Sequence, residues 1–230
     1  RVTEDFDNGT LETLKAYDVV LLNYSSRWNY ADPVQNVWSD AAFKALYQYV
    51  REGGGLVAFH SSFTWGRDIP EYKALIGATM EPGTSRRAPP GAFTVHLTDR
   101  SHPITAGMRE YIWTYNDDMY TNMAFAPDAK IHVLGTAHDS SAAYDHKLTG
   151  PKYPAEAYTQ EKLKKMGGMD ADHPQLWVQD YGKGRVFSIT IGHDEVSLHF
   201  APLQTLLLRG TEWAATGKVT LPVLQEAKDY

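Results

Sequence analysis

The chain of 230 residues contains no cysteine, and this absence excludes several kinds of chemistry at once. Without thiols there is no disulfide, no thiolate metal site and no cysteine nucleophile. The sequence also lacks the run of roughly 20 apolar residues that a membrane-spanning helix needs, so we expect no membrane partner. Positive charge is scarce, because 22 Lys and Arg residues stand against 28 Asp and Glu residues. The resulting net charge of -6 argues against a nucleic-acid partner.

Several nucleotide and nucleophile motifs are missing as well. The sequence has no P-loop, no dinucleotide glycine fingerprint and no His-Glu-x-x-His motif. The glycines at 53–55 precede an apolar run rather than follow one, so they do not form a phosphate cradle, and we expect no nucleotide or flavin cofactor. The Gly-x-Ser-x-Gly elbow is absent, so we interpret Ser61 and Ser62 as capping residues, with Ser61 also placed to contact a substrate.

What is present is the composition of one α/β domain over residues 1–230. The hydrophobic share of 43% and the charged share of 22% are ordinary for a globular protein of this length. The 6 Trp and 14 Tyr residues are compatible with core packing and with the stacking of sugar rings. The first residues are typical of a strand end, so we expect an upstream strand and helix to be missing from this sequence.

The first half of the chain shows a strand–helix–strand pattern. The apolar run at 17–23 predicts a central parallel strand that is buried on both faces. Ser39 is a candidate cap for a helix whose apolar residues recur from Phe43 to Val50, and Gly53 ends it. The run at 56–59 is the next strand. Because such units cross over right-handed, we expect a mostly parallel sheet.

The second half predicts further elements around a long polar segment. We expect an exposed or edge strand at 92–97, a short strand at 131–134 and an insertion at about 140–174 with a helix near 161–166. A hairpin of 175–180 with 185–191 and a last helix from about Pro202 to Gly217 should follow. The insertion is expected to lie over one end of the sheet, because long loops in compact domains are often functional.

Two histidines stand where apolar strands end. His60 follows the run that begins after Gly55, and His193 follows the run that begins after Gly184. In open α/β sheets, residues at the carboxyl ends of strands build the binding site. We therefore predict that both imidazoles face one shared cleft.

Acidic and aromatic residues supply the remaining candidates. Asp117 and Asp118 are adjacent carboxylates that could act as acid and base or bind a cation, although such pairs are also common in solvated turns. The candidates for substrate contact, besides Ser61, are Asn23, Trp28, Tyr120 and Trp177, with core packing as the alternative for each tryptophan. We interpret Arg86 and Arg87 as a solvated loop rather than an anion clamp, and His102 as support for the turn before Pro103.

Taken in order, these motifs resemble the ThuA-like family, which is named for trehalose utilisation. The resemblance rests on Tyr-Asp-Val-Val-Leu at 17–21, Gly-Gly-Gly-Leu-Val-Ala-Phe-His at 53–60, Leu-Ile-Gly at 75–77, His-Pro-Ile-Thr-Ala-Gly-Met at 102–108, Asp-Asp-Met-Tyr at 117–120, Trp177, and Tyr-Gly-Lys-Gly-Arg-Val-Phe with the later Gly-His at 181–193. It implies a flavodoxin-like, three-layer fold related to class I glutamine amidotransferases. Those enzymes carry a cysteine after the strand that ends here at His60, so the resemblance excludes amidotransferase activity. The family usually has Asp-Glu-x-Tyr where this chain has Asp117 and Asp118.

The resemblance implies a bacterial protein of sugar catabolism and leads to two hypotheses. The first is an enzyme that cleaves oxidised (3-keto) glycosides, with His60 or His193 as base, Asp117 or Asp118 as its partner, and a divalent metal ion held by His60, His193 and Asp118. The second is a sugar-binding or accessory protein without catalysis. Association with an oxidoreductase, a homo-oligomer, and either the cytoplasm or the periplasm all remain open.

Overall fold

A seven-stranded mixed sheet organises the part of the chain that the computed structural model describes, residues 2–3, 6, 9–24, 38–66, 68–144 and 158–225. The strands, in their order across the sheet, are β1 (Val19–Leu22), β2 (Gly55–Phe59), β11 (Gly184–Ile189), β10 (Ala171–Tyr181), β9 (His132–Asp139), β5 (Gly91–Leu97) and β6 (Tyr111–Asp117). The predicted hairpin is thus present as β10 and β11, and it lies in the middle of the sheet.

The expected α/β class holds, but the sheet is less parallel than the sequence suggested. Strand β2 pairs in parallel with β1 and with β11, whereas β11, β10, β9, β5 and β6 pair antiparallel. The reason is the tight turn at Gly182, where φ is 65°, which sends β10 and β11 in opposite directions. The expectation of a central, fully buried strand at 17–23 is also wrong, because β1 is the edge strand of the described sheet and Leu21 is 49% exposed.

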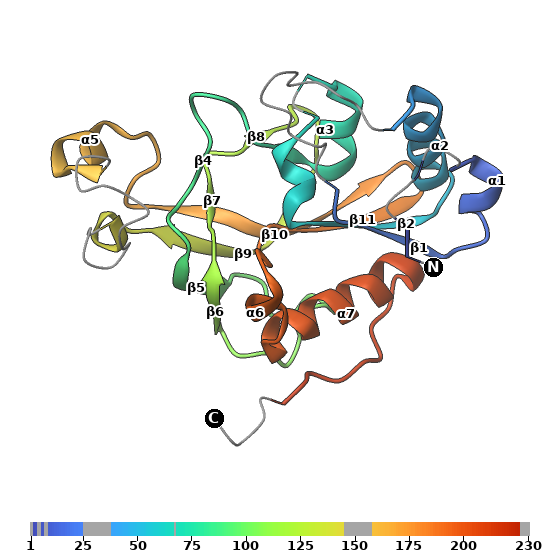
Figure 1. The fold of residues 1–230 in the computed structure, drawn as a ribbon. Coiled ribbons are helices and arrows are strands. Elements are labelled where there is room, and N and C mark those ends of the chain that lie inside the picture. The colour runs from blue at the N-terminus through green and yellow to red at the C-terminus, as the bar shows by residue number, and fades with distance from the viewer. Residues whose placement is uncertain are drawn as a thin grey trace.

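Helices cover both faces of the sheet and make the three expected layers (Figure 1). On one side lie α1 (Leu11–Leu14), α2 (Asp40–Arg51) and α3 (Pro70–Ile76), and on the other lie α6 (Glu195–Leu198) and α7 (Ala201–Thr216). The helix predicted from Ser39 forms because the Ser39 side chain accepts a hydrogen bond from the backbone N–H of Ala42. Helix α7 ends at Gly217 in the left-handed conformation, as its sequence predicts.

Two apolar clusters fill the spaces between the layers. One contains Phe43 and Leu46 from α2 together with Leu75 and Ile76 from α3, and it packs on one face of the sheet. The other contains Leu203 and Leu206 from α7 with Val57, Phe187 and Ile189 from the strands. Because both faces of β2 are buried in this way, its end at His60 is held rigidly.

The polar segment at 140–174 is partly a piece of the sheet. Residues 145–157 lie outside the described part, and the rest contains η2 (Ser141–Tyr144) and α5 (Gln160–Lys165). Strand β10 begins at Ala171, which pairs with Asp139 of β9, so the expected insertion ends earlier than predicted because these residues complete a ladder. Strand β5 is likewise not an edge, since it lies between β9 and β6.

Two short ribbons lie outside the main sheet. Strand β3 (Ala78–Thr79) pairs with β8 (Ala124–Phe125), and β4 (Arg86–Arg87) pairs with β7 (Tyr120–Thr121). The second ribbon matters for the site, because it sets Arg87 directly opposite Tyr120. None of the helices in the described ranges is long and apolar enough to cross a membrane.

Candidate functional site

His60 stands at the junction of β2 and the short 3-10 helix η1 (His60–Thr64) in an unusual backbone conformation. Its φ of 35° lies in the left-handed region, which residues other than glycine rarely adopt. The side chain is only 4% exposed, and its Nδ1 lies 2.7 Å from the carbonyl oxygen of Thr190, just past β11. Strain of this kind persists only where the surroundings enforce it, and it clusters at functional sites.

The contact with Thr190 also decides the tautomer of His60. A carbonyl oxygen can only accept, so Nδ1 carries the proton and Nε2 presents a lone pair. That Nε2 lies 3.3 Å from the hydroxyl of Tyr120 and 3.6 Å from Oδ1 of Asp118. Burial lowers the pKa of His60, although the nearby Asp118 opposes this effect. Burial thus favours the neutral imidazole, whose Nε2 is held beside the Tyr120 hydroxyl and Asp118.

Asp117 holds the loop that carries His193. Its buried carboxylate accepts hydrogen bonds from the backbone N–H groups of Gly192 at 2.8 Å and His193 at 3.1 Å. It also accepts from the Thr114 hydroxyl at 2.7 Å and from the N–H of Asp118 at 3.0 Å. Burial raises the pKa of Asp117, while these donors favour its charged form. With its oxygens occupied by the protein itself, Asp117 is placed to position the loop rather than to exchange protons with a substrate.

Asp118 points into the space between the two histidines. It is 2% exposed, and its Oδ1 lies 3.3 Å from Nδ1 of His193 and 3.6 Å from Nε2 of His60. Neither contact has hydrogen-bond geometry, so Oδ1 is a buried acceptor without a hydrogen-bond partner among the described residues. The other oxygen, Oδ2, lies 3.3 Å from the guanidinium of Arg87. A buried, unpaired carboxylate oxygen is costly, which points to a role in binding a proton donor or a cation.

His60, Asp118 and His193 together have the donor set of a metal site. One ligand atom from each lies within 4.8 Å of the others. Bonds of about 2.1 Å from nitrogen and oxygen ligands to a shared cation would leave neighbouring ligands on the order of 3 Å apart, close to the observed contacts. The contact from His60 to Thr190 matches the second interaction that metal-binding histidines usually make. The residues present therefore fit a divalent cation.

The structure thus brings His60 and His193 together, as the strand-end argument predicted, and places Asp118 between them. Their rings and carboxylate come from β2, from the β6–β7 connection and from the loop after β11. The imidazole centroids of His60 and His193 are 5.4 Å apart. The side chain of His193 is 35% exposed, so the cluster is reached from solvent on that side. The chemical roles of these residues stay predictions.

Tyr120 and Arg87 complete the surroundings of the cluster. Tyr120 is fully buried, and burial raises the pKa of its hydroxyl, so it remains a protonated donor beside His60. Arg87 was missed by the sequence reasoning, which interpreted it as part of a solvated loop. Its side chain is 52% exposed, yet it contacts Asp118 because β4 pairs with β7. Arg86 is not free either, because it pairs with Asp139 at 2.7 Å.

The predicted substrate-contact residues have different outcomes. Trp177 is fully buried and its indole N–H donates to the carbonyl of Ile76 at 3.0 Å, so the expectation that it stacks on a sugar is wrong. Its burial follows from its place on β10 in the middle of the sheet. Asn23 is exposed directly after β1, and Ser61 is partly buried in η1. Trp28 lies outside the described residues.

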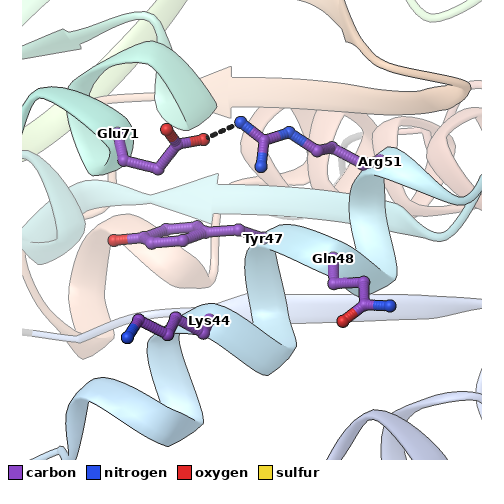
Figure 2. Close-up of a pocket in the computed structure, with 5 residues that line it drawn as sticks. All are labelled: Lys44, Tyr47, Gln48, Arg51 and Glu71. Carbon is purple, nitrogen blue, oxygen red and sulfur yellow. Dashed lines mark hydrogen bonds and ion pairs between the residues drawn. The ribbon is translucent and has the colours of Figure 1, made fainter.

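A separate hollow lies over α2 and contains none of the predicted site residues. Its volume is about 480 Å³, and Figure 2 shows the residues that line it: Lys44, Tyr47, Gln48, Arg51 and Glu71. Arg51 and Glu71 form an ion pair of 2.5 Å across it. This pairing satisfies the two charges within the protein, so the cluster around Asp118 is the stronger candidate for chemistry.

Comparison with known families agrees with the order of motifs in the sequence. A family model named ThuA and described as trehalose utilisation matches residues 1–214. The chain belongs to the ThuA family. No curated protein sequence matches the chain. The family description is the basis for a function in carbohydrate utilisation, and the His60, Asp118 and His193 cluster is the candidate site of this ThuA-family chain.

Solved structures of similar proteins support the fold. A ThuA-like protein from Parabacteroides merdae has a TM-score of 0.70 at 22% sequence identity, over 96% of this chain and 77% of that one. Another from Bacteroides uniformis has a TM-score of 0.65 at 21% identity, over 95% and 77% of the two chains. A protein from Salmonella typhimurium described as cytoplasmic has a TM-score of 0.51 at 14% identity, over 89% and 74%. At these identities the similarity establishes the fold alone.

Proposed function

We propose that this ThuA-family chain is a carbohydrate-processing enzyme that cleaves oxidised (3-keto) glycosides at the cluster of His60, Asp118 and His193. The family description, trehalose utilisation, supports a carbohydrate substrate. The observation that carries catalysis is the buried Oδ1 of Asp118, which has no hydrogen-bond partner and lies between two imidazoles. Leaving such a group unpaired costs about 1–3 kcal/mol or more, a cost that a role in substrate chemistry explains.

The chemistry of a 3-keto sugar suits a site of this kind. The ketone acidifies the C–H bond at C2, so a base can remove that proton. The electron pair then expels the glycosidic oxygen from C1, and the departing oxygen takes up a proton to leave as the free alcohol. Water adds to the resulting double bond, so the overall change is hydrolysis. Such a substrate requires a separate oxidoreductase that first oxidises the C3 hydroxyl.

The different exposures of the two histidines support a different role for each in this proposal. His193 is the solvent-accessible imidazole, so it is the group that can reach the C2 proton. The carboxylate of Asp118 beside its Nδ1 stabilises the imidazolium that forms. His60 is buried and fixed by Thr190, so it contributes a polar nitrogen of constant position. Arg87, partly exposed next to Asp118, is placed to bind the substrate oxygen on which negative charge develops.

A divalent cation fits the same cluster through Nε2 of His60, Oδ1 of Asp118 and Nδ1 of His193. When bound there, it would supply positive charge that polarises the keto oxygen. In that arrangement His193 holds the cation with Nδ1 and is no longer the base. The two uses of His193 exclude each other, so metal analysis of the purified protein decides between them.

The test is release of the leaving sugar from a 3-keto glycoside. The protein is incubated with 3-keto-trehalose or a 3-keto-glucoside, with added divalent metal in one arm and a chelator in the other. We expect release in at least one arm, and its loss in both His60→Ala and His193→Ala. His199→Ala is the matched control, because His199 has a side chain that is 72% exposed. If no arm releases sugar while a known enzyme for this substrate does, the proposal fails. Sugar binding without turnover would instead support the accessory role.

A further inference from the structure

Three exposed aromatic side chains lie in a row along β6. Tyr111, Trp113 and Tyr115 are 54%, 63% and 56% exposed, whereas Ile112 and Thr114 between them are buried. The alternation is that of a strand with one face in the core and one in solvent. What is unusual is that the solvent face carries the large rings. We call these three residues the aromatic stripe.

Each end of the aromatic stripe is braced by another ring. His96 stacks on Tyr111 with a centroid distance of 4.8 Å and an interplanar angle of 17°. Phe200, just before α7, stacks on Tyr115 at 6.2 Å and 24°. Trp113 in the centre lies opposite Thr94 in the register of β5 and β6, and it has no ring partner among the described residues. The result is a rigid row whose central indole is open to solvent.

The aromatic stripe runs directly into the candidate site. Asn116 follows Tyr115, has a φ of 52°, and donates a hydrogen bond to Asp194, the residue after His193. Asp117 and Asp118 come next. Strand β6 is the edge strand of the described sheet, and it contacts α6 beyond His193 (Figure 1). The row of rings is therefore linked to the candidate cluster by Asn116 and by the contact of β6 with α6.

We propose that the aromatic stripe binds a chain of pyranose sugars and leads one end of it toward His193. Rows of large aromatic rings with half or more of their surface in solvent commonly mark binding sites. Aromatic faces pack well against the apolar C–H faces of sugar rings, while their polar neighbours serve the hydroxyl groups. Successive rings on one face of a strand are about 7 Å apart, so the row suits several linked sugars rather than one.

A sugar chain fits this surface better than a second copy of the protein does. The stripe is one strand wide, and its neighbours Thr94, Glu110 and Asn116 are polar, while Phe200 adds one apolar ring at the Tyr115 end. A stable protein interface needs a broad, well-packed centre in addition to aromatic anchors. The proposal rests on the proposed function only for the direction of the chain toward His193, because binding to the stripe needs no catalysis.

The experiment measures binding to soluble glucans. Wild-type protein, Trp113→Ala and the control Tyr17→Ala, which removes a tyrosine that is 43% exposed next to β1, are run on native gels containing an α-glucan or a β-glucan. Glucose and a series of longer oligosaccharides are then titrated by calorimetry. We expect one glucan to retard the wild type and Tyr17→Ala, affinity to rise with chain length, and Trp113→Ala to bind about tenfold more weakly.

Two further measurements separate this proposal from its rivals. His193→Ala should still be retarded, because binding to the stripe needs no catalysis. Wild-type protein that binds a glucan but releases no sugar from a 3-keto glycoside would support the stripe while the proposed catalysis fails. Trp113→Ala should cleave a small 3-keto-glucoside at the wild-type rate. If no glucan retards the protein, the proposal is overturned. It is also overturned if ultracentrifugation shows a wild-type dimer that Trp113→Ala dissociates, because the stripe is then an interface between copies.

Discussion

Oδ1 of Asp118 lies 3.3 Å from Nδ1 of His193, although one residue follows β6 and the other follows β11. The same oxygen has no hydrogen-bond partner and is almost completely buried. The fold thus maintains an electrostatically unfavourable group at the point where two imidazoles meet. Functional sites commonly contain such destabilising groups. Replacing one of them often raises the stability of the fold and lowers the activity.

The first prediction follows from this opposition. Asp118→Asn removes the buried charge, so we expect the free energy of unfolding to rise by about 1 kcal/mol while sugar release and any metal binding are lost. Its ion pair with Arg87 adds little to stability, because the arginine is half exposed. Urea denaturation and metal analysis measure the two effects. A variant that is both less stable and fully active would show that Asp118 has only a structural role.

Asp117 is expected to behave in the opposite way. Asp117→Asn replaces an acceptor oxygen with an NH₂ group that faces backbone donors, and it disturbs the bonds to Gly192 and His193. The free energy of unfolding should fall by on the order of 3 kcal/mol, since hydrogen bonds to charged groups contribute strongly. Urea denaturation measures it, with the exposed Asp128→Asn as the control. Equal stability of the two variants would contradict the positioning role.

Gly192 offers a test of how tightly the His193 loop is fitted. Its φ is 118°, and an added Cβ would lie 2.3 Å from the ring of Phe59. We expect Gly192→Ala to destabilise the protein by about 2 kcal/mol or more and to abolish sugar release, because the loop must move. Gly83→Ala is the matched control, with a φ of 80° and no atom within 4 Å of the new Cβ. Thermal unfolding should separate the two, and similar losses would mean that backbone strain alone matters.

The fourth prediction concerns pH and His102, away from the candidate site. Burial lowers the pKa of His102, and the neighbouring His132 adds to this, while Asp99 opposes it. Below its usual value of about 6.5 the unfolded chain binds a proton that the folded chain resists, so stability falls with falling pH. This contribution vanishes above that value, where both states are neutral.

His102→Asn keeps an acceptor for the N–H of Ile104 but cannot titrate. We therefore expect its melting temperature to fall less than that of the wild type between pH 7 and pH 5. His199→Asn should follow the wild type, since the His199 side chain is mostly exposed. Parallel curves for the wild type and His102→Asn would contradict the assigned shift.

Local patterns predicted the elements better than their arrangement. The cap at Ser39, the end of α7 at Gly217 and the strand before His60 were all read correctly, because each depends on neighbours in the chain. The antiparallel pairing of β9 with β10 and β5, and the edge position of β1, were not, because sheet order depends on which strands meet after folding. Trp177 was misjudged for the same reason, since tryptophan serves cores and sugar sites alike.

The sequence alone determined that the site is cysteine-free and that two imidazoles end buried strands, because composition and apolar runs act locally. Only the tertiary structure decided which carboxylate points between them. Asp117 and Asp118 are adjacent and chemically alike. The backbone N–H groups of Gly192 and His193 bond to Asp117, whereas Oδ1 of Asp118 has no hydrogen-bond partner among the described residues. Arg87 likewise reaches Asp118 only because β4 pairs with β7. Contacts between segments that are distant in the sequence thus determine which of these side chains surround the two imidazoles, and no local sequence pattern encodes such contacts.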